Sequence, residues 1–260
     1  MLHVTDAHLV QIDDRDADRQ EASAEFCRLF EGSEAGFQTE MARAAELEVD
    51  LVGLTGDIVC FPSHAAIEYA SEVIGRVKPP VLYTSGNHDW RFPDVARTAE
   101  QRDLWWPRLD PLSDGQPAFR GLEVGGIQFL AIDNSTYQIS PEQLQSVRAH
   151  LENGKPTVIL SHIPLSIATL RDPTIEMWKA PILVGDPHWE PESRAKIGAG
   201  DDTPSTLEYV RMLTGAENLV AIFCGHVHFT HEDTVSPHAV QYVGAPCFST
   251  PGQLVEFMPL

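Results

Sequence analysis

The sequence predicts an α/β fold in one domain that covers residues 1–260. Short apolar runs alternate with longer amphipathic stretches, which is the order expected when strands and helices follow each other along the chain. Two later runs, at 119–124 and 127–132, are separated only by a glycine pair and therefore predict a β-hairpin. Because a hairpin is antiparallel, the sheet that contains it should be mixed.

In the N-terminal part, apolar runs predict three strands, at 2–5, 50–55 and 81–85. Apolar residues at helical spacing predict a helix at 37–47. Ser63 is a good N-cap residue and predicts a helix at 64–76, which a proline pair then ends. The acidic, polar stretch 10–35 is expected to be a loop with at most a short helix.

In the C-terminal part, helices are predicted at 93–106, 140–151 and 206–213, the second of them with Pro141 at its first position. Further strands are expected at 157–160, 219–224, 240–243 and 254–257. The segment 163–203 breaks this rhythm because it is rich in proline, glycine and charge. An irregular insertion of this length predicts a functional loop or a lid, and it could equally pack across a homo-oligomer.

Composition narrows the class of partner. There are 18 Lys and Arg residues against 38 Asp and Glu residues, which gives a net charge of −20. Such a surface repels nucleic acid and anionic lipid, so we expect neither as a partner, but a small phosphate substrate is not excluded. No apolar run has the length of a membrane span and no signal-peptide pattern is present, so a cytoplasmic location is expected.

Five short motifs rich in metal-ligating side chains each follow an apolar run: Asp6-Ala7-His8, Gly56-Asp57, Gly86-Asn87-His88-Asp89, Ser161-His162 and Gly225-His226-Val227-His228. Ligands of α/β sheets bind beyond the carboxyl ends of the strands, so we expect these motifs to converge at one edge of the sheet. Imidazole and carboxylate ligands favour Mn, Fe, Zn or Co over Ca. Two such ions can clamp a phosphoryl group, which predicts metal-assisted hydrolysis of a phosphate ester.

The order of these motifs resembles that of the calcineurin-like metallophosphoesterase superfamily, whose pattern is D-x-H, G-D, G-N-H-D/E, H and G-H-x-H. The resemblance extends from residue 1 to about 245 and, within the superfamily, is greatest to class III cyclic-nucleotide phosphodiesterases. It implies a four-layer α-β-β-α sandwich with two mixed sheets. It also implies that hydroxide held by the metals attacks phosphorus in line.

The resemblance implies a ligand group for each of two metal ions, with one carboxylate shared: Asp6, His8 and His228 for the first ion, Asn87, His162 and His226 for the second, and Asp57 for both. His88 would face the substrate and either donate a proton or stabilise phosphoryl charge. Asp89 would orient the His88 ring.

One position departs from a related pattern. Purple acid phosphatases have a tyrosine ligand three residues after the bridging aspartate, and this chain has Cys60 there. We therefore predict that the iron-loaded protein lacks the purple charge-transfer colour.

Charge favours phosphodiesters as substrates. Two divalent ions, two carboxylates and a bridging hydroxide leave the site at about +1, which suits a singly charged diester. A monoester usually requires added Arg or Lys, and only Arg91 adjoins the motifs.

Several alternatives stay open from the sequence. A phosphomonoesterase or protein phosphatase is the rival enzyme, although the arginine-bearing motifs of Ser/Thr protein phosphatases are missing. A catalytically inactive scaffold of the same fold is the rival from another class. Asp133-Asn134 could contact the site or form an ordinary turn, and Trp90, Arg91 and Phe92 could line a pocket or pack in the core. The physiological substrate and metal are not specified by these patterns.

Overall fold

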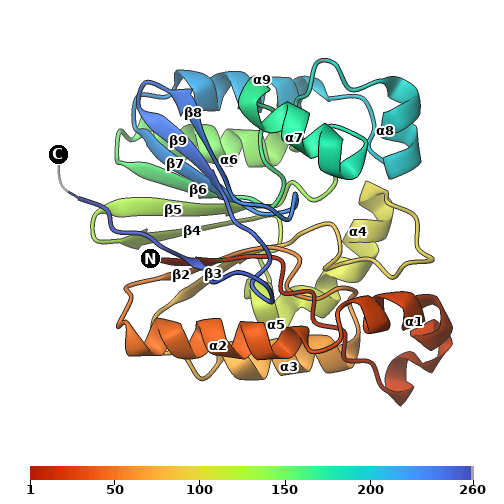
Figure 1. Ribbon diagram of the computed structural model, residues 1–260. Helices are drawn as coiled ribbons and strands as arrows, with labels where there is room; N and C mark the ends of the chain where they lie inside the picture. The colour runs from red at the N-terminus through yellow and green to blue at the C-terminus, as the bar shows by residue number, and fades with distance from the viewer. Residues whose placement is uncertain (259–260) are drawn as a thin grey trace.

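The computed structural model describes residues 1–258, and its two mixed β-sheets face each other with helices on both outer sides (Figure 1). The first sheet has the order β10-β1-β2-β3, with bounds Gln253–Leu254, Leu2–Val4, Val52–Thr55 and Val81–Thr84. Its β1, β2 and β3 are parallel, and β10 pairs antiparallel with β1. The predicted four-layer sandwich is therefore confirmed.

The second sheet has the order β4-β5-β6-β7-β9-β8. Its strands span Phe119–Val124, Ile127–Ile132, Thr157–Leu160, Leu219–Cys224, Ala239–Val243 and His231–Ser236 in that order. The middle four are parallel, whereas β4 and β8 are antiparallel edge strands. The predicted hairpin is present as β4 and β5. The polar edge strand β8 was not predicted, because its pairing with β9 rather than an apolar run defines it.

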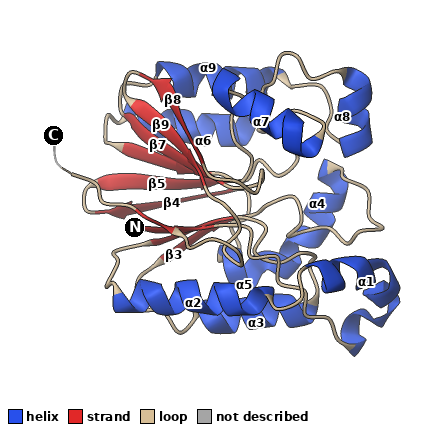
Figure 2. Cartoon of the chain, in the orientation of Figure 1, coloured by secondary structure: helices blue, strands red, loops and turns tan. Residues whose placement is uncertain are grey.

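Helices form the two outer layers (Figure 2). The layer on the first sheet contains α2 (Ser33–Glu46), α3 (His64–Ile74) and α5 (Asp110–Ser113), and that on the second contains α6 (Pro141–Glu152), α7 (Ala168–Trp178) and α9 (Pro204–Gly215). Caps set two of these starts. Ser63 Oγ accepts the backbone N–H of Ala66, and Ser140 forms a reciprocal capping box with Gln143.

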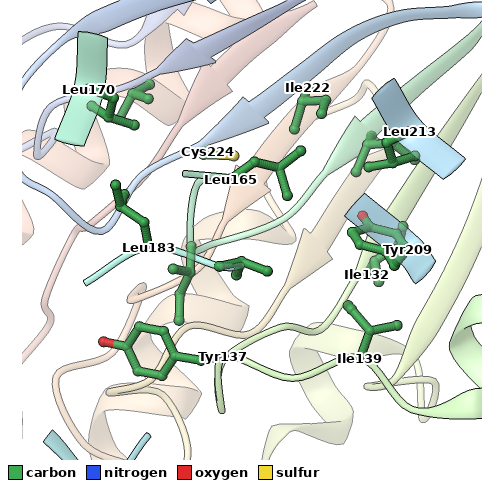
Figure 3. Close-up of a cluster of buried hydrophobic side chains, with 14 of the residues drawn as sticks. Ile132, Tyr137, Ile139, Leu165, Leu170, Leu183, Tyr209, Leu213, Ile222 and Cys224 are labelled. Carbon is green, nitrogen blue, oxygen red and sulfur yellow. The ribbon is translucent and has the colours of Figure 1, made fainter. Parts of the chain in front are cut away.

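Three apolar clusters separate the four layers. Between the sheets, both faces contribute large side chains such as Leu82, Phe129, Leu160 and Phe223. A second cluster lies between β2 and β3 and their helices. The third lies above the second sheet, where Ile132, Leu170, Tyr209 and Leu213 meet (Figure 3). Burial on both faces explains why the central strands read as continuous apolar runs.

Three sequence expectations are corrected. The stretch 10–35 is not a loop, since it holds a 3-10 helix, η1 (Asp14–Arg19), and α1 (Gln20–Leu29). Phe26 and Phe30 pack this region against a cluster containing Phe61 and Phe92, a tertiary contact that local periodicity does not reveal.

The segment 163–203 likewise contains α7 and α8 (Pro191–Ile197). The helix predicted at 93–106 is shorter than expected. It begins only after Thr98, as α4 (Ala99–Trp105), and a 3-10 turn, η2 (Trp106–Leu109), follows it. The preceding turn is held by Arg91, whose Nη1 donates to the carbonyls of Phe92, Pro93 and Val95. Within residues 1–258, no helix combines the length and apolar character that crossing a bilayer requires.

Candidate metal centre

The five motifs lie beyond the carboxyl ends of β1, β2, β3, β6 and β7. The first three strands belong to one sheet and the last two to the other, so the motifs converge across two sheets rather than at the edge of one. In Figure 1 these strand ends open toward the side that carries α1, α4 and α8. The convergence brings Asp6, Asp57 and the four predicted histidine ligands into two close groups.

The first group consists of Asp6, His8 and His228, whose candidate ligand atoms all lie within 4.8 Å of one another. The Nε2 atoms of His8 and His228 are 3.1 Å apart, and His228 Nε2 lies 3.3 Å from Asp6 Oδ1. Three lone-pair atoms directed at the same point repel one another unless a cation lies between them. The donor set therefore fits a divalent metal ion.

The second group consists of Asp57, His162 and His226. His162 donates its Nδ1–H to the carbonyl oxygen of Thr55 at 2.7 Å, which leaves Nε2 facing Asp57 Oδ2, 3.1 Å away. Neighbouring Asn87 has a buried Oδ1 with no hydrogen-bond partner in the described structure. A buried amide oxygen without a donor is costly, and a metal ion would satisfy it.

Asp57 lies between the two groups. Its Oδ2 is 3.1 Å from His162 Nε2 and 3.9 Å from His8 Nε2. Its other oxygen accepts the backbone N–H of His88 at 2.7 Å, which fixes the carboxylate. The position is the one that a bridging ligand would need.

Electrostatics among the side chains of the two groups favour positive charge at the site. Burial alone would raise the pKa of Asp57, but His162, His88 and His8 hold this pKa well below its usual range. Burial opposes charge on His162, yet Asp57 outweighs it and raises the pKa of this imidazole to about 9. Burial lowers the pKa of His226 well below its usual range, so this ring is neutral and able to ligate.

The backbone is strained where it presents these ligands. Positive φ angles occur at Asp6, His8, Asp57, His226 and His228, which are five of the nine such non-glycine residues in the described chain. This region is disfavoured for residues with a Cβ and persists where the surrounding structure imposes it. Glycine is also required at position 225, here for lack of space, because a Cβ would collide with Thr5 Oγ1 and Asp6 Oδ2.

The expected role of Asp89 is corrected. Its carboxylate does not hold the His88 ring but accepts three backbone N–H groups, those of Asp57, Val59 and Gly86, at 2.7–2.8 Å. Asp89 therefore ties the second motif to the third. The His88 ring is instead oriented by Cys60, whose carbonyl oxygen lies 3.3 Å from Nδ1. Because a carbonyl only accepts, Nδ1 carries the proton and Nε2 has the lone pair.

Other residues that the sequence analysis named near the motifs pack in the core or hold the loops around the site. Trp90 and Phe92 are fully buried in the core, and Arg91 secures the turn that follows. Asp133 accepts hydrogen bonds from Ser85 and Arg102, so it braces the end of β3. The Cys60 thiol lies in a group with His8 and His88, and burial raises the pKa of this thiol well above its usual range.

Two residues that the motifs did not indicate contact the ligands. The Tyr137 hydroxyl lies 3.1 Å from His226 Nε2, which leaves Nδ1 as the nitrogen available to a metal. Trp178 donates its Nε1–H to the carbonyl of Val227 at 2.9 Å, and its ring meets the His228 ring edge-on. No sequence signal marks Tyr137, whereas Trp178 belongs to the insertion that was expected to be functional.

Comparisons with known proteins identify the family and the fold. The family model described as calcineurin-like phosphoesterase matches residues 1–229. No curated protein matches. Among solved structures, a dimetal phosphatase from Danio rerio superposes with a TM-score of 0.59 at 13% identity, covering 96% of this chain and 88% of that one.

Two further structures share the fold. The phosphopantetheinyl hydrolase PptH from Mycobacterium tuberculosis has a TM-score of 0.50 at 14% identity, over 95% of this chain and 89% of its own. The purple acid phosphatase PPD1 from yellow lupin has a TM-score of 0.54 at 13% identity, over 100% of this chain and 45% of its own.

A two-sheet sandwich with paired His and Asp groups at its strand ends defines a dimetal phosphoesterase. The chain belongs to the calcineurin-like phosphoesterase family, a family of dimetal-dependent hydrolases.

Proposed function

We propose that this protein hydrolyses small phosphodiesters, such as cyclic nucleotides, with two metal ions. The observation that carries the proposal is the position of the Asp57 carboxylate between two groups of buried lone-pair atoms. Asp6, His8 and His228 would hold one ion, and Asn87, His162 and His226 the other. Such ions, when bound, polarise the phosphoryl group and provide a nucleophile at neutral pH.

The residues of the chain supply positioning and proton handling. Burial lowers the pKa of His88 to about 3, so this ring is neutral before substrate binds. An anionic phosphoryl group beside Nε2 would favour the protonated ring and raise this pKa. His88 would then stabilise phosphoryl charge and pass its proton to the leaving oxygen.

A preference for diesters over monoesters rests on charge. The site carries about +1 when two divalent ions and a hydroxide are present. Arg91 adjoins the third motif but is committed to backbone carbonyls through Nη1. A singly charged diester is therefore the better electrostatic match.

The proposal is tested by metal analysis together with hydrolysis of bis(p-nitrophenyl) phosphate and p-nitrophenyl phosphate in the presence of Mn²⁺. We expect about two metal ions per chain and faster cleavage of the diester. His88→Ala should keep both ions while lowering turnover by a factor on the order of 10²–10⁴. His238→Ala, at an exposed position, is the matched control. Well-folded protein with neither metal nor turnover would support a scaffold instead.

A phosphomonoesterase is a second candidate, and Arg97 is the observation that favours it. Within the described residues Arg97 has no carboxylate partner, and its Nη1 donates only to the carbonyl of Ile197 at 3.1 Å. Its charge adds to burial in lowering the pKa of His88, and it opposes the rise that burial causes in the pKa of Tyr137. Arg97→Gln should slow monoester hydrolysis more than diester hydrolysis if this candidate is right.

A further inference from the structure

Three aromatic side chains from distant segments surround the histidines of the first ligand group. Phe30, just after α1, stacks on the His8 ring with centroids 4.3 Å apart and an interplanar angle of 6°. Trp178, the last residue of α7, meets His228 edge-on at 5.4 Å. Phe248 meets Phe30 at 5.6 Å and His8 at 6.3 Å. These three side chains are called the aromatic rim below.

Two members of the aromatic rim have large exposed surfaces. Trp178 is 40% exposed and Phe248 is 37% exposed, although both touch the rings of buried or nearly buried histidines. The indole N–H of Trp178 is already bonded to the carbonyl of Val227, so its polar atom is satisfied and its orientation is fixed. What it presents to solvent beside the metal centre is therefore apolar ring surface.

Specific backbone contacts position the segment that carries Phe248. The backbone N–H of Cys247 donates to the carbonyl of Thr5 at 3.1 Å, which ties this segment to the residue before Asp6. On its other side, α2 approaches so closely that a Cβ at Gly36 would lie 2.6 Å from Phe248 Cα. Phe248 is thus held in place from two sides, and it is not a chance exposure on a loose loop.

The two sides of the rim lie on opposite sides of the strand ends. In Figure 1, α1 lies on the side of the first sheet and α7 on the side of the second, with the strand ends between them. Rings at both sides of the opening can flank a flat group that enters toward the ligands. Such surfaces bind planar π-systems through stacking and apolar contact, without selecting particular hydrogen-bonding groups.

We propose that the aromatic rim binds the organic group of the substrate and selects phosphate esters whose organic group carries an aromatic ring. This inference rests on the proposed phosphoesterase function and specifies its substrate class. The phosphoryl group would lie at the metal centre, and the ring beside Trp178 and Phe248. Esters with small aliphatic groups would gain nothing from the rim.

The test compares phenylphosphonate with methylphosphonate as ligands of the Mn²⁺-loaded protein, by isothermal titration calorimetry. Both probes carry the same phosphonyl head, so their difference reports the ring alone. Trp178→Ala and Phe248→Ala should each weaken phenylphosphonate binding by about tenfold and leave methylphosphonate unchanged. Trp178→Phe should restore most of the loss. Met177→Ala, at the adjacent 52% exposed position of α7, is the control and should change neither probe.

Equal affinity of both probes for the wild-type protein, or equal losses of both in the variants, would overturn the proposal. Turnover is measured separately with dibenzyl phosphate and diethyl phosphate, which differ in whether the organic group carries an aromatic ring. If neither ester is cleaved, the phosphoesterase proposal fails, while the phosphonate titrations still decide whether the rim selects aromatic groups. If both are cleaved at the same specificity constant and bind alike, only the rim proposal fails.

Discussion

His3 should make folding stability depend on pH, and the burial of its ring gives the sign and the size of the effect. The ring is 1% exposed, with Nδ1 2.8 Å from Gln253 Oε1 and Nε2 2.7 Å from Thr55 Oγ1. The amide oxygen only accepts, so Nδ1 carries the proton and the Thr55 hydroxyl donates to Nε2. The neutral ring thus satisfies both contacts, and a second proton would place a positive charge in a buried site.

Burial lowers the pKa of His3 from 6.5 to about 4. The unfolded chain therefore binds this proton first as pH falls, so stability is fully present above pH 6.5 and is lost toward pH 4. A shift of this size corresponds to about 3 kcal/mol at pH 4.

The assay is urea unfolding of the metal-free protein at pH 7 and pH 4, for wild type and for His3→Gln. Other groups also titrate in this range, so the informative quantity is the difference between the two proteins in their loss of unfolding free energy. We expect the variant to lose about 3 kcal/mol less than wild type on acidification. His238→Gln, at an exposed position, should behave as wild type. Equal losses in wild type and His3→Gln would refute the reasoning.

Three further variants probe the metal centre. Tyr137→Phe removes the hydroxyl beside His226 Nε2 and should weaken binding of one metal about ten- to hundredfold, seen as a second, looser phase in Mn²⁺ titration. Unchanged affinity for both ions would show that the hydroxyl does not tune the ligand. Gly225→Ala places a methyl group against Thr5 and Asp6, so metal analysis should show loss of at least one ion together with a lower Tm. Retention of full metal content would contradict that packing. Asp57→Asn removes the charge that faces both ligand groups, and metal content should fall for both ions, whereas loss of only one would exclude a bridging role.

The local sequence determined the strands and motifs because their signals are short-range. Runs such as 52–55 and 157–160 are buried on both faces and therefore apolar throughout, and each metal-ligand motif lies within a few residues of its strand. A chain leaving a buried strand must turn, and the absence of a Cβ at Gly225 lets the chain pass directly against Thr5 and Asp6. The order of motifs was thus sufficient to predict the family, and the assignment of each ligand to an ion stays a prediction.

Tertiary structure decided what depends on residues distant in sequence. The role of Asp89 that the family resemblance implied was wrong, because this carboxylate accepts the N–H groups of Asp57 and Val59, which come from another loop. Tyr137 and His226 are 89 residues apart, so no local pattern relates them. The same holds for the α1 region, for the aromatic rim and for the convergence of motifs from two sheets, since each depends on residues distant in sequence. A hydrogen bond or ring contact depends on distance in space, and only packing of the whole chain sets that distance.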